Sequence, residues 1–173
     1  MNRLWAPWRM SYIAGIDAKD EGCVFCLKQS ADDDRKNLIV HRGRKCFVVL
    51  NLFPYNNGHL MVIPYGHYSD IGKLDPETSG ELWSLLGLSQ RVLSAVIHPD
   101  GFNIGMNLGR VAGAGIDTHL HAHIVPRWSG DTNFMPILGE TKVISQGLTD
   151  AYDALLPAFR SIAGSSSDSA SSR

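Results

Sequence analysis

The chain has 173 residues, of which 44% are hydrophobic and 19% are charged, and its formal net charge is −1. These values are typical of one globular domain with a full core, and a charge near zero gives no overall field that would recruit nucleic acid or an acidic membrane. No apolar run approaches the roughly 18 residues of a membrane-spanning helix, and three cysteines are too few for a disulfide framework. We therefore expect a cytoplasmic protein with neither a nucleic-acid partner nor a membrane partner.

Three regions differ in composition along the chain. Residues 1–22 are aromatic and basic and have no clear periodicity, so we expect an arm whose Trp5 and Trp8 pack on the domain or on a partner subunit. Residues 23–163 are predicted to form a single domain with a C-terminal extension. The Ser-rich residues 164–173 are predicted to be a disordered tail.

Cys23 and Cys26 open the predicted domain with the spacing of half a tetrahedral zinc site. His67 and His119 are the histidines available to complete the ligand set. Because four protein ligands leave no open position, such a zinc ion would be structural. The alternatives are two buried apolar cysteines or a redox pair, although a redox pair usually accompanies an alternating strand–helix pattern that this sequence lacks.

Two buried strands are predicted over 46–52 and 59–63, and an Asn-Gly turn joins them into a hairpin. Asn51 in the first strand and Asn107 further along are either turn residues or ligands of a ribose hydroxyl or phosphate oxygen. His59 begins the second strand, a position typical of an ordinary surface histidine.

A long helix is predicted to begin at Asp75, which can cap it, and to end at 98–101. A strand follows over 102–108, and a shorter helical stretch over 148–162, in which Pro157 is expected to kink or divide the helix. Strands joined in sequence by short turns, with one long helix between strand pairs, predict an α+β fold with a mainly antiparallel sheet and a C-terminal helical segment.

His119, His121 and His123 alternate with apolar residues, and this period of two is typical of a strand that carries all three imidazoles on one face. Same-face neighbours on a strand lie roughly 7 Å apart, about the span of a phosphate group with its contacts. An unpaired ring nitrogen in an apolar core would cost about 1–3 kcal/mol, so the pattern favours a functional face. An exposed polar face and a zinc cluster of histidines alone are the alternatives.

A neutral imidazole can attack phosphorus to form a phosphoramidate, and it leaves readily once it is protonated. The nucleophile needs one free ring nitrogen and one that is bonded to an acceptor. His121, in the centre of the motif, suits this role, and His123 can bond the transferred phosphate or support the leaving group. Backbone N–H groups around Gly113, Ala114 and Gly115 can approach the phosphate oxygens.

The alternating histidines resemble the motif of the histidine-triad (HIT) family. The other strands of that domain are matched in the same order, so that the resemblance rests on Asn51, 58–64, 103–109 and 119–125. It covers about residues 23–128. Outside these bounds, segments 4–10 and 126–134 are similar to the bacterial diadenosine-tetraphosphate phosphorylase branch of the family.

The resemblance implies a homodimer built on antiparallel sheets, which binds a purine nucleotide and attacks its α-phosphate. By position, His121 is the family's nucleophile, Asn51 falls where the family binds ribose, and Asn107 falls near the phosphate. The zinc-bearing branches of the family have their ligands at the positions of Cys23, Cys26, His67 and His119. This alignment assigns the first triad histidine to zinc rather than to substrate.

One departure from the family pattern bears on the reaction. Many hydrolases of the family carry Gln and then often Ser or Thr shortly before the triad, where this chain has Gly115 and Ile116. The missing amide and hydroxyl remove donors that would hold phosphate oxygens and assist the leaving group. A small residue also leaves room for an incoming phosphate ion, which favours phosphorolysis.

The expected activity is cleavage of a dinucleoside polyphosphate, such as diadenosine tetraphosphate, at the α-phosphate through a covalent nucleotidyl-histidine. Inorganic phosphate or water resolves the intermediate, and structural zinc is the expected cofactor. The alternatives are a hydrolase of nucleoside phosphoramidates or other mononucleotide adducts, a nucleotide-binding regulatory module with little turnover, and a zinc-dependent hydrolase. The predicted site comprises the catalytic residues His121 and His123, the nucleotide-binding residues Asn51, His59, Asn107, Gly113, Ala114, Gly115 and His123, and the metal ligands Cys23, Cys26, His67 and His119.

Overall fold

The computed structural model describes residues 22–131 and 147–168, so the predicted aromatic arm lies outside the described residues except for Gly22. The strands are β1 (Ile39–Arg42), β2 (Cys46–Leu50), β3 (Leu60–Pro64), β4 (Gly101–Met106) and β5 (Ala122–Arg127). The helices are α2 (Val24–Ser30), α3 (Asp34–Asn37), α4 (Pro76–Ile97) and α6 (Leu148–Asp168), with short 3₁₀ turns η1 (Ile71–Lys73) and η2 (Arg110–Ala112). None of these described helices is long and apolar enough to cross a membrane.

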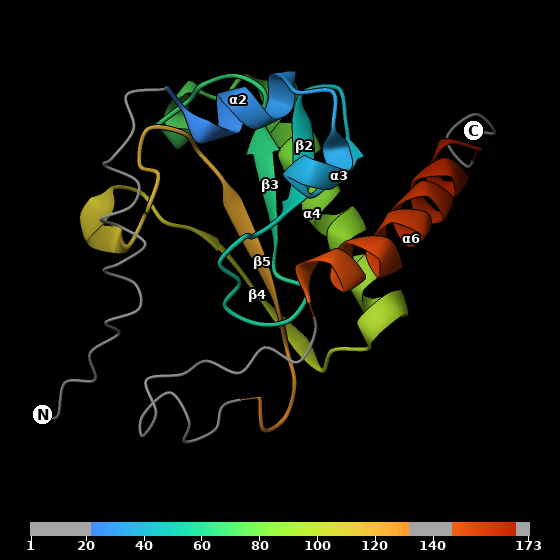
Figure 1. Cartoon of the computed structure of the whole chain (residues 1–173). Helices are drawn as coiled ribbons and strands as arrows, with labels where there is room; N and C mark the ends of the chain where they lie inside the picture. Colours follow the sequence, from blue (N-terminus) through green and yellow to red (C-terminus); the bar gives the residue numbers. More distant parts are fainter. Residues whose placement is uncertain (1–21, 132–146, 169–173) are drawn as a thin grey trace, which may run out of the picture.

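The five strands form one sheet in the order β1-β2-β3-β5-β4, and every neighbouring pair is antiparallel. In Figure 1 the long helix α4 lies behind the strands, and α2 crosses at their upper ends. This arrangement confirms the predicted α+β fold with an antiparallel sheet, one long helix and a C-terminal helix. The predicted hairpin is β2 paired with β3, which runs in register from Cys46 opposite Pro64 to Leu50 opposite Leu60.

Successive strand residues point to opposite sides of the sheet, and both sides carry buried side chains, whereas the middle of β4 is exposed. The face toward α4 and α6 carries Val40, Cys46, Val48, Leu50, Leu60, Val62, Ala122 and Ile124. The opposite face carries Ile39, Phe47, Val49, Met61 and Ile63, which pack with Phe25 of α2. Met61 lies opposite His123 in the β3–β5 register, so this histidine belongs to the Phe25 face of the sheet.

Local signals determine both ends of α4, as predicted. The Asp75 side chain accepts a 2.9 Å hydrogen bond from the Thr78 backbone N–H, and Pro76 occupies the first helical position, where no donor is needed. At the other end His98 adopts the left-handed conformation with φ +47°, which ends the helix.

Several elements differ from the sequence prediction. The helix α2 and the strand β1 were not predicted, and β4 begins and ends earlier than the expected strand over 102–108. The C-terminal helix α6 continues through Pro157, so it is not divided there, and it extends to Asp168 into the region expected to be a disordered tail. Residues 169–173 of that expected tail lie outside the described part of the chain.

Candidate active site and metal centre

The three triad histidines lie at the start of β5 and in the segment before it. Their exposed fractions are only 1% for His119, 6% for His121 and 8% for His123, which rules out an exposed polar face. The predicted strand was too long, because β5 begins only at Ala122. The segment before Ala122 hydrogen-bonds to the loop after β3 instead, because the Leu120 backbone N–H donates to the Tyr68 carbonyl at 2.6 Å.

The hydrogen bonding of His121 determines its tautomer. Its Nδ1 lies 2.9 Å from the backbone carbonyl oxygen of His119, and because a carbonyl only accepts, Nδ1 carries the proton. Burial lowers the pKa of His121, against the opposing effect of that hydrogen bond, so the ring is neutral near pH 7. A neutral ring with its proton on Nδ1 keeps a lone pair on Nε2, which is the state that a nucleophile requires.

His59 is completely buried, so the expectation of an ordinary surface histidine was wrong. Its Nδ1 accepts a 3.0 Å hydrogen bond from the Tyr55 backbone N–H. A neutral His59 therefore carries its proton on Nε2, which lies 3.0 Å from Nδ1 of His123. Because Nδ1 of His123 accepts this hydrogen bond, a neutral His123 carries its proton on Nε2. That N–H group can donate a hydrogen bond to a phosphate oxygen or to a leaving group.

Asn51 lies beside this histidine pair at the end of β2. Its amide nitrogen is 3.3 Å from Nδ1 of His59, and its Oδ1 accepts a hydrogen bond from the Phe53 backbone N–H at 3.0 Å. The residue is therefore a turn residue that also supports His59. The following loop carries three half-exposed apolar side chains, Leu52, Phe53 and Tyr55, of which Tyr55 contacts the buried histidine.

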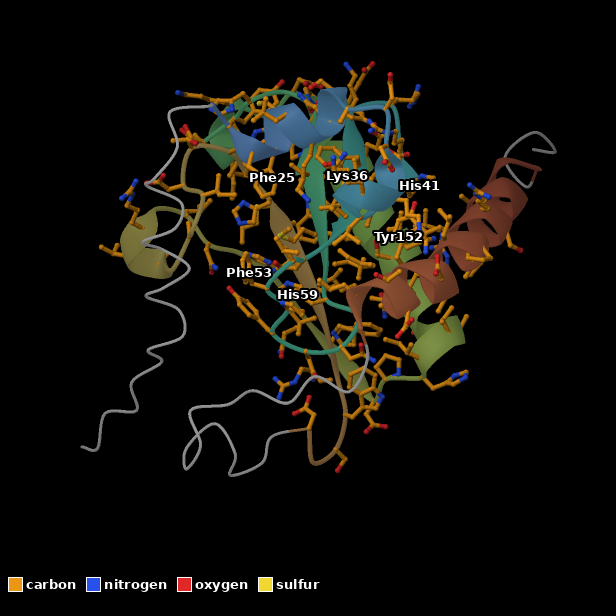
Figure 2. The ribbon with its side chains drawn as sticks, in the orientation of Figure 1. Phe25, Lys36, His41, Phe53, His59 and Tyr152 are labelled. Carbon is orange, nitrogen blue, oxygen red and sulfur yellow. The ribbon has the colours of Figure 1, made fainter. Side chains whose placement is uncertain are left out.

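Ring contacts connect His121, its histidine neighbours and that loop. The ring of Tyr55 lies 4.7 Å from the His59 ring and 5.7 Å from the His123 ring, measured between centroids. The rings of His121 and His123 meet edge to face at 4.9 Å. In the view of Figure 2, the labelled Phe53 and His59 lie below Phe25. The sequence analysis missed Tyr55 as a site residue, and its position four residues before His59 was the available signal.

The glycine-rich loop takes a shape that partly contradicts its predicted role. Gly109 and Gly113 have φ values of +81° and +93°, which favour glycine. However, the Gly113 and Ala114 N–H groups donate to carbonyls within the loop, at 2.9 and 3.3 Å, so these two predicted phosphate donors are already engaged. The third predicted donor, the Gly115 N–H, takes part in neither of these two hydrogen bonds.

Asn107 follows directly after β4 and is half-buried. Met106, the last residue of β4, pairs with Ala122 across the sheet. Asn107 and His121 are therefore the chain neighbours of the last residue pair in the β4–β5 ladder, although they are 14 positions apart in the sequence.

The four predicted metal ligands meet at one point. The ligand atoms of Cys23, Cys26, His67 and His119 all lie within 4.8 Å of one another. Nδ1 of His119 is 3.2 Å from the Cys23 sulfur, and Nδ1 of His67 is 3.4 Å from the Cys26 sulfur. His119 donates its other ring proton to the Pro64 carbonyl at 2.9 Å, which turns the lone pair of Nδ1 toward the sulfurs.

Two sulfurs and two imidazole nitrogens are a tetrahedral donor set that suits Zn²⁺, and the four protein ligands leave no open position for catalysis. The cysteines in the cluster exclude a site made of histidines alone. They also contradict the alternative of two buried apolar cysteines, because both are partly exposed and turned toward imidazoles. The cluster can therefore hold a structural metal ion.

A cavity of about 520 Å³ lies elsewhere, between α3 and α6. Its lining includes Arg35, Lys36 and Tyr152, and Figure 2 shows the last two well away from His59. The guanidinium of Arg35, one of the lining charges, is engaged in an ion pair with Asp153 of α6. The triad and the metal cluster, rather than this cavity, bring together the groups able to do chemistry.

Comparison with known proteins agrees with this geometry. Residues 33–130 match the sequence model of the HIT domain. The chain is 44% identical over 156 residues to an AP-4-A phosphorylase of Mycobacterium tuberculosis, a match that spans 87% of this chain and 80% of the relative. It is also 31% identical over 105 residues to an adenosine 5′-monophosphoramidase of Schizosaccharomyces pombe, spanning 61% of this chain and 74% of the relative.

A solved structure supports the same relationship. A Zn-bound histidine triad family protein from Mycobacterium smegmatis superposes with a TM-score of 0.67 at 26% identity, over 83% of this chain and 97% of that one. The domain match covers more than half of the sequence, and the mycobacterial phosphorylase match covers most of it. The chain therefore belongs to the HIT family of nucleotide hydrolases and transferases.

Proposed function

We propose that this protein cleaves a dinucleoside polyphosphate, such as diadenosine tetraphosphate, and transfers the nucleotidyl group from His121 to inorganic phosphate. The observation that carries the proposal is the 2.9 Å hydrogen bond between Nδ1 of His121 and the His119 carbonyl. It leaves Nε2 as a lone-pair donor in a neutral, buried ring. The 44% identity to a mycobacterial AP-4-A phosphorylase supports the choice of substrate.

The proposed reaction has two displacements at the α-phosphorus. First, Nε2 of His121 forms a bond to phosphorus while the phosphorus–oxygen bond to the remaining nucleotide breaks, and the electron pair of that bond leaves with the departing oxygen, to which His123 donates a hydrogen bond from its Nε2–H. Next, an oxygen of inorganic phosphate attacks the same phosphorus and the phosphorus–nitrogen bond breaks. With diadenosine tetraphosphate the products are ATP and ADP. Water in place of phosphate would give ATP and AMP.

Other groups of the site support binding of this substrate. The amide of Asn51 lies where a ribose hydroxyl could replace its internal hydrogen bonds, and the half-exposed rings of Phe53 and Tyr55 provide apolar surface for a base. The N–H of Gly115 and the side chain of Asn107 remain the proposed ligands of phosphate oxygens. Glycine at position 115 leaves space that a longer side chain would occupy, which favours entry of a phosphate ion.

We also propose that the protein acts as a homodimer. β4 is an edge strand of the sheet, and its Ile104 is 45% exposed. An unpaired edge with an exposed apolar side chain readily pairs with another strand, and a second copy of the same edge is its own antiparallel complement. Sedimentation equilibrium checks this proposal, and a mass of one chain at micromolar concentration would contradict it.

The test of the reaction uses the intact chain, diadenosine tetraphosphate and ¹⁸O-labelled inorganic phosphate. We expect the label to appear in the β-phosphate of ADP. Unlabelled AMP in place of ADP would show a hydrolase, and nucleotide binding without turnover would favour a regulatory module. Mass spectrometry of acid-sensitive adducts identifies the intermediate, because the adenylyl group should be found on His121.

Gly115→Gln is a matched variant for the choice between phosphate and water. A longer side chain with an amide reduces the space for phosphate and adds a donor for phosphate oxygens. We expect the ratio of ADP to AMP to fall by about 10-fold, since one polar contact changes a transition state by about 1.4 kcal/mol. An unchanged ratio would contradict the argument from side-chain size.

A further inference from the structure

We propose that Phe25 is a positioning residue for the nucleophile, and that ligation of a metal ion by Cys23 and Cys26 holds its ring against His121. This inference rests on the proposed function of His121. It gives the cysteine turn a second role beyond stabilising the fold. The position of His121 in the phosphate-transfer site then depends on the metal centre, because Phe25 contacts residues of both.

The position of Phe25 is the first observation. It lies between the two cysteines on α2 and is only 4% exposed. Its ring meets the His119 ring edge to face at 5.5 Å, and it lies 5.2 Å from the His121 ring at an angle of 55°, measured between centroids. Phe25 therefore contacts one proposed metal ligand and the proposed nucleophile at the same time.

His119 provides a second connection between the two centres. Its Nδ1 lies in the metal cluster, and its Nε2 proton is donated to the Pro64 carbonyl. Its backbone carbonyl accepts the Nδ1 proton of His121. The residue that binds metal through its ring thus holds the nucleophile through its backbone. Movement of the His119 ring or of α2 would disturb the same imidazole.

The helix α2 needs an external constraint to hold Phe25 in place. It has seven residues, and its N-cap residue Cys23 makes no side-chain capping hydrogen bond. Isolated helices shorter than about 12 residues are marginal in water, so tertiary contacts and metal ligation must hold this one. A metal ion bound to both cysteines would clamp the first turn of α2, which is the turn that carries Phe25.

The contact predicts a specific kinetic effect. The single hydrogen bond at Nδ1 leaves the His121 ring free to tilt about it, and the Phe25 ring blocks one direction of tilt. A displacement of about 1 Å at a nucleophile lowers the rate by roughly 100-fold. Phe25 does not belong to the Asn51–Tyr55 loop that we assign to ribose and base, so its removal should reduce kcat and leave KM unchanged.

The test compares Phe25→Met with Phe47→Leu in the zinc-loaded full chain. Phe47 is a matched control, because it is fully buried in the same apolar cluster but packs its ring on Tyr65 at 5.4 Å. We expect the Phe25 variant to keep one zinc per chain and a KM within 2-fold, while kcat falls by about 10- to 100-fold. The control should keep kcat within about 3-fold despite a similar loss of apolar packing.

An NMR readout makes the test independent of turnover. With ¹³C-labelled histidine, the His121 ring protons should shift in Phe25→Met because the neighbouring ring current is lost, and the His59 signals should stay in place. Removal of zinc by a chelator should broaden or shift the same His121 signals in the unchanged chain. If the His121 signals stay in place after metal removal, the proposed clamp is wrong.

Two other kinetic outcomes would contradict the positioning role of Phe25. A higher KM with unchanged kcat would mean that Phe25 contacts the nucleobase, and equal losses of kcat in both variants would mean general loosening of the core. Either result overturns the proposal. If the variant loses its fold by circular dichroism, Phe25→Tyr retains the ring and should retain kcat. If the unchanged chain transfers no nucleotide but the His121 signals respond as expected, the proposed function fails while the positioning role stands.

Discussion

The two faces of the sheet each carry a buried cluster, but the clusters are built from different chemistry. The face toward α4 and α6 is mainly hydrocarbon, with residues such as Val62 and Ile124 packed in one large apolar cluster. The opposite face combines a smaller apolar cluster with imidazoles, of which His59, His121 and His123 are each held by a hydrogen bond. We therefore expect the first face to contribute mainly to stability and the second to carry the proposed chemistry. Substitutions on the two faces should therefore change different measured quantities.

The largest effect is expected for His121→Asn on the reactive face. Without a nitrogen able to bond phosphorus, we expect kcat to fall by about 10⁴-fold or more, with Tm changed by only a few degrees. His41→Asn is the matched control on the other face, because the His41 ring stacks on Phe159 of α6 at 5.8 Å. It should lower Tm and keep kcat. Comparable losses of kcat in both variants would remove the distinction between the faces.

Removal of the metal should have the next largest effect, which is on Tm. Elemental analysis is expected to give one zinc per chain, and Cys26→Ser is expected to lose it. A ligand that binds the folded state at a thousand times its Kd adds about 4 kcal/mol, so stripping zinc should lower Tm by about 10 °C. Cys46→Ser is the control, because this buried cysteine lies on the α4 face and donates to the Thr78 carbonyl. Much less than one zinc per chain would exclude the cluster as a zinc site.

Leu93→Ala tests the hydrocarbon face directly. Leu93 is fully buried in α4, and truncation should reduce the free energy of unfolding by about 3 kcal/mol in a urea titration. At a temperature where the variant stays folded, we expect unchanged kcat and KM. A substantial change in either kinetic constant would show that packing behind the sheet is transmitted to the histidines.

Glu81→Gln should have a smaller effect on stability. The Glu81 carboxylate on α4 accepts hydrogen bonds from the backbone N–H groups of Arg44, Lys45 and Cys46 in the turn between β1 and β2. A neutral amide offers one accepting oxygen in place of two, which should cost about 1–2 kcal/mol in the same titration. Retained stability would mean that the turn holds its shape without this anchor.

The smallest effect concerns the far end of β5, where Arg127 pairs with Asp131. The hydrogen bond from Arg127 holds the pKa of Asp131 down at about 2, below its ordinary value of 3.8. A carboxyl with a lowered folded-state pKa stabilises the fold above pH 3.8 and loses that contribution as pH falls toward 2. Asp131→Asn should therefore reduce Tm at pH 6 and make Tm less dependent on pH between 4 and 2. An identical pH dependence in both chains would contradict this assignment.

The sequence by itself determined the features that depend on local pattern and spacing. Two short apolar runs joined by an Asn-Gly turn predicted the β2–β3 hairpin, and Asp75 predicted the start of α4, because turn residues and caps act over a few residues. The Cys23–Cys26 spacing and the alternating histidines predicted two kinds of chemistry. Family resemblance then assigned His119 to the metal cluster and His121 to the phosphate chemistry.

Only the tertiary structure decided which groups meet. The burial of His59, the late start of β5 at Ala122, and the contact of Phe25 with His121 all depend on partners distant in the sequence. The engaged N–H groups of Gly113 and Ala114 likewise depend on how their own loop folds. Hydrogen bonds and ring contacts act over a few ångströms in space, so a local pattern can name the reactive groups, and the packing of the chain determines how they are held.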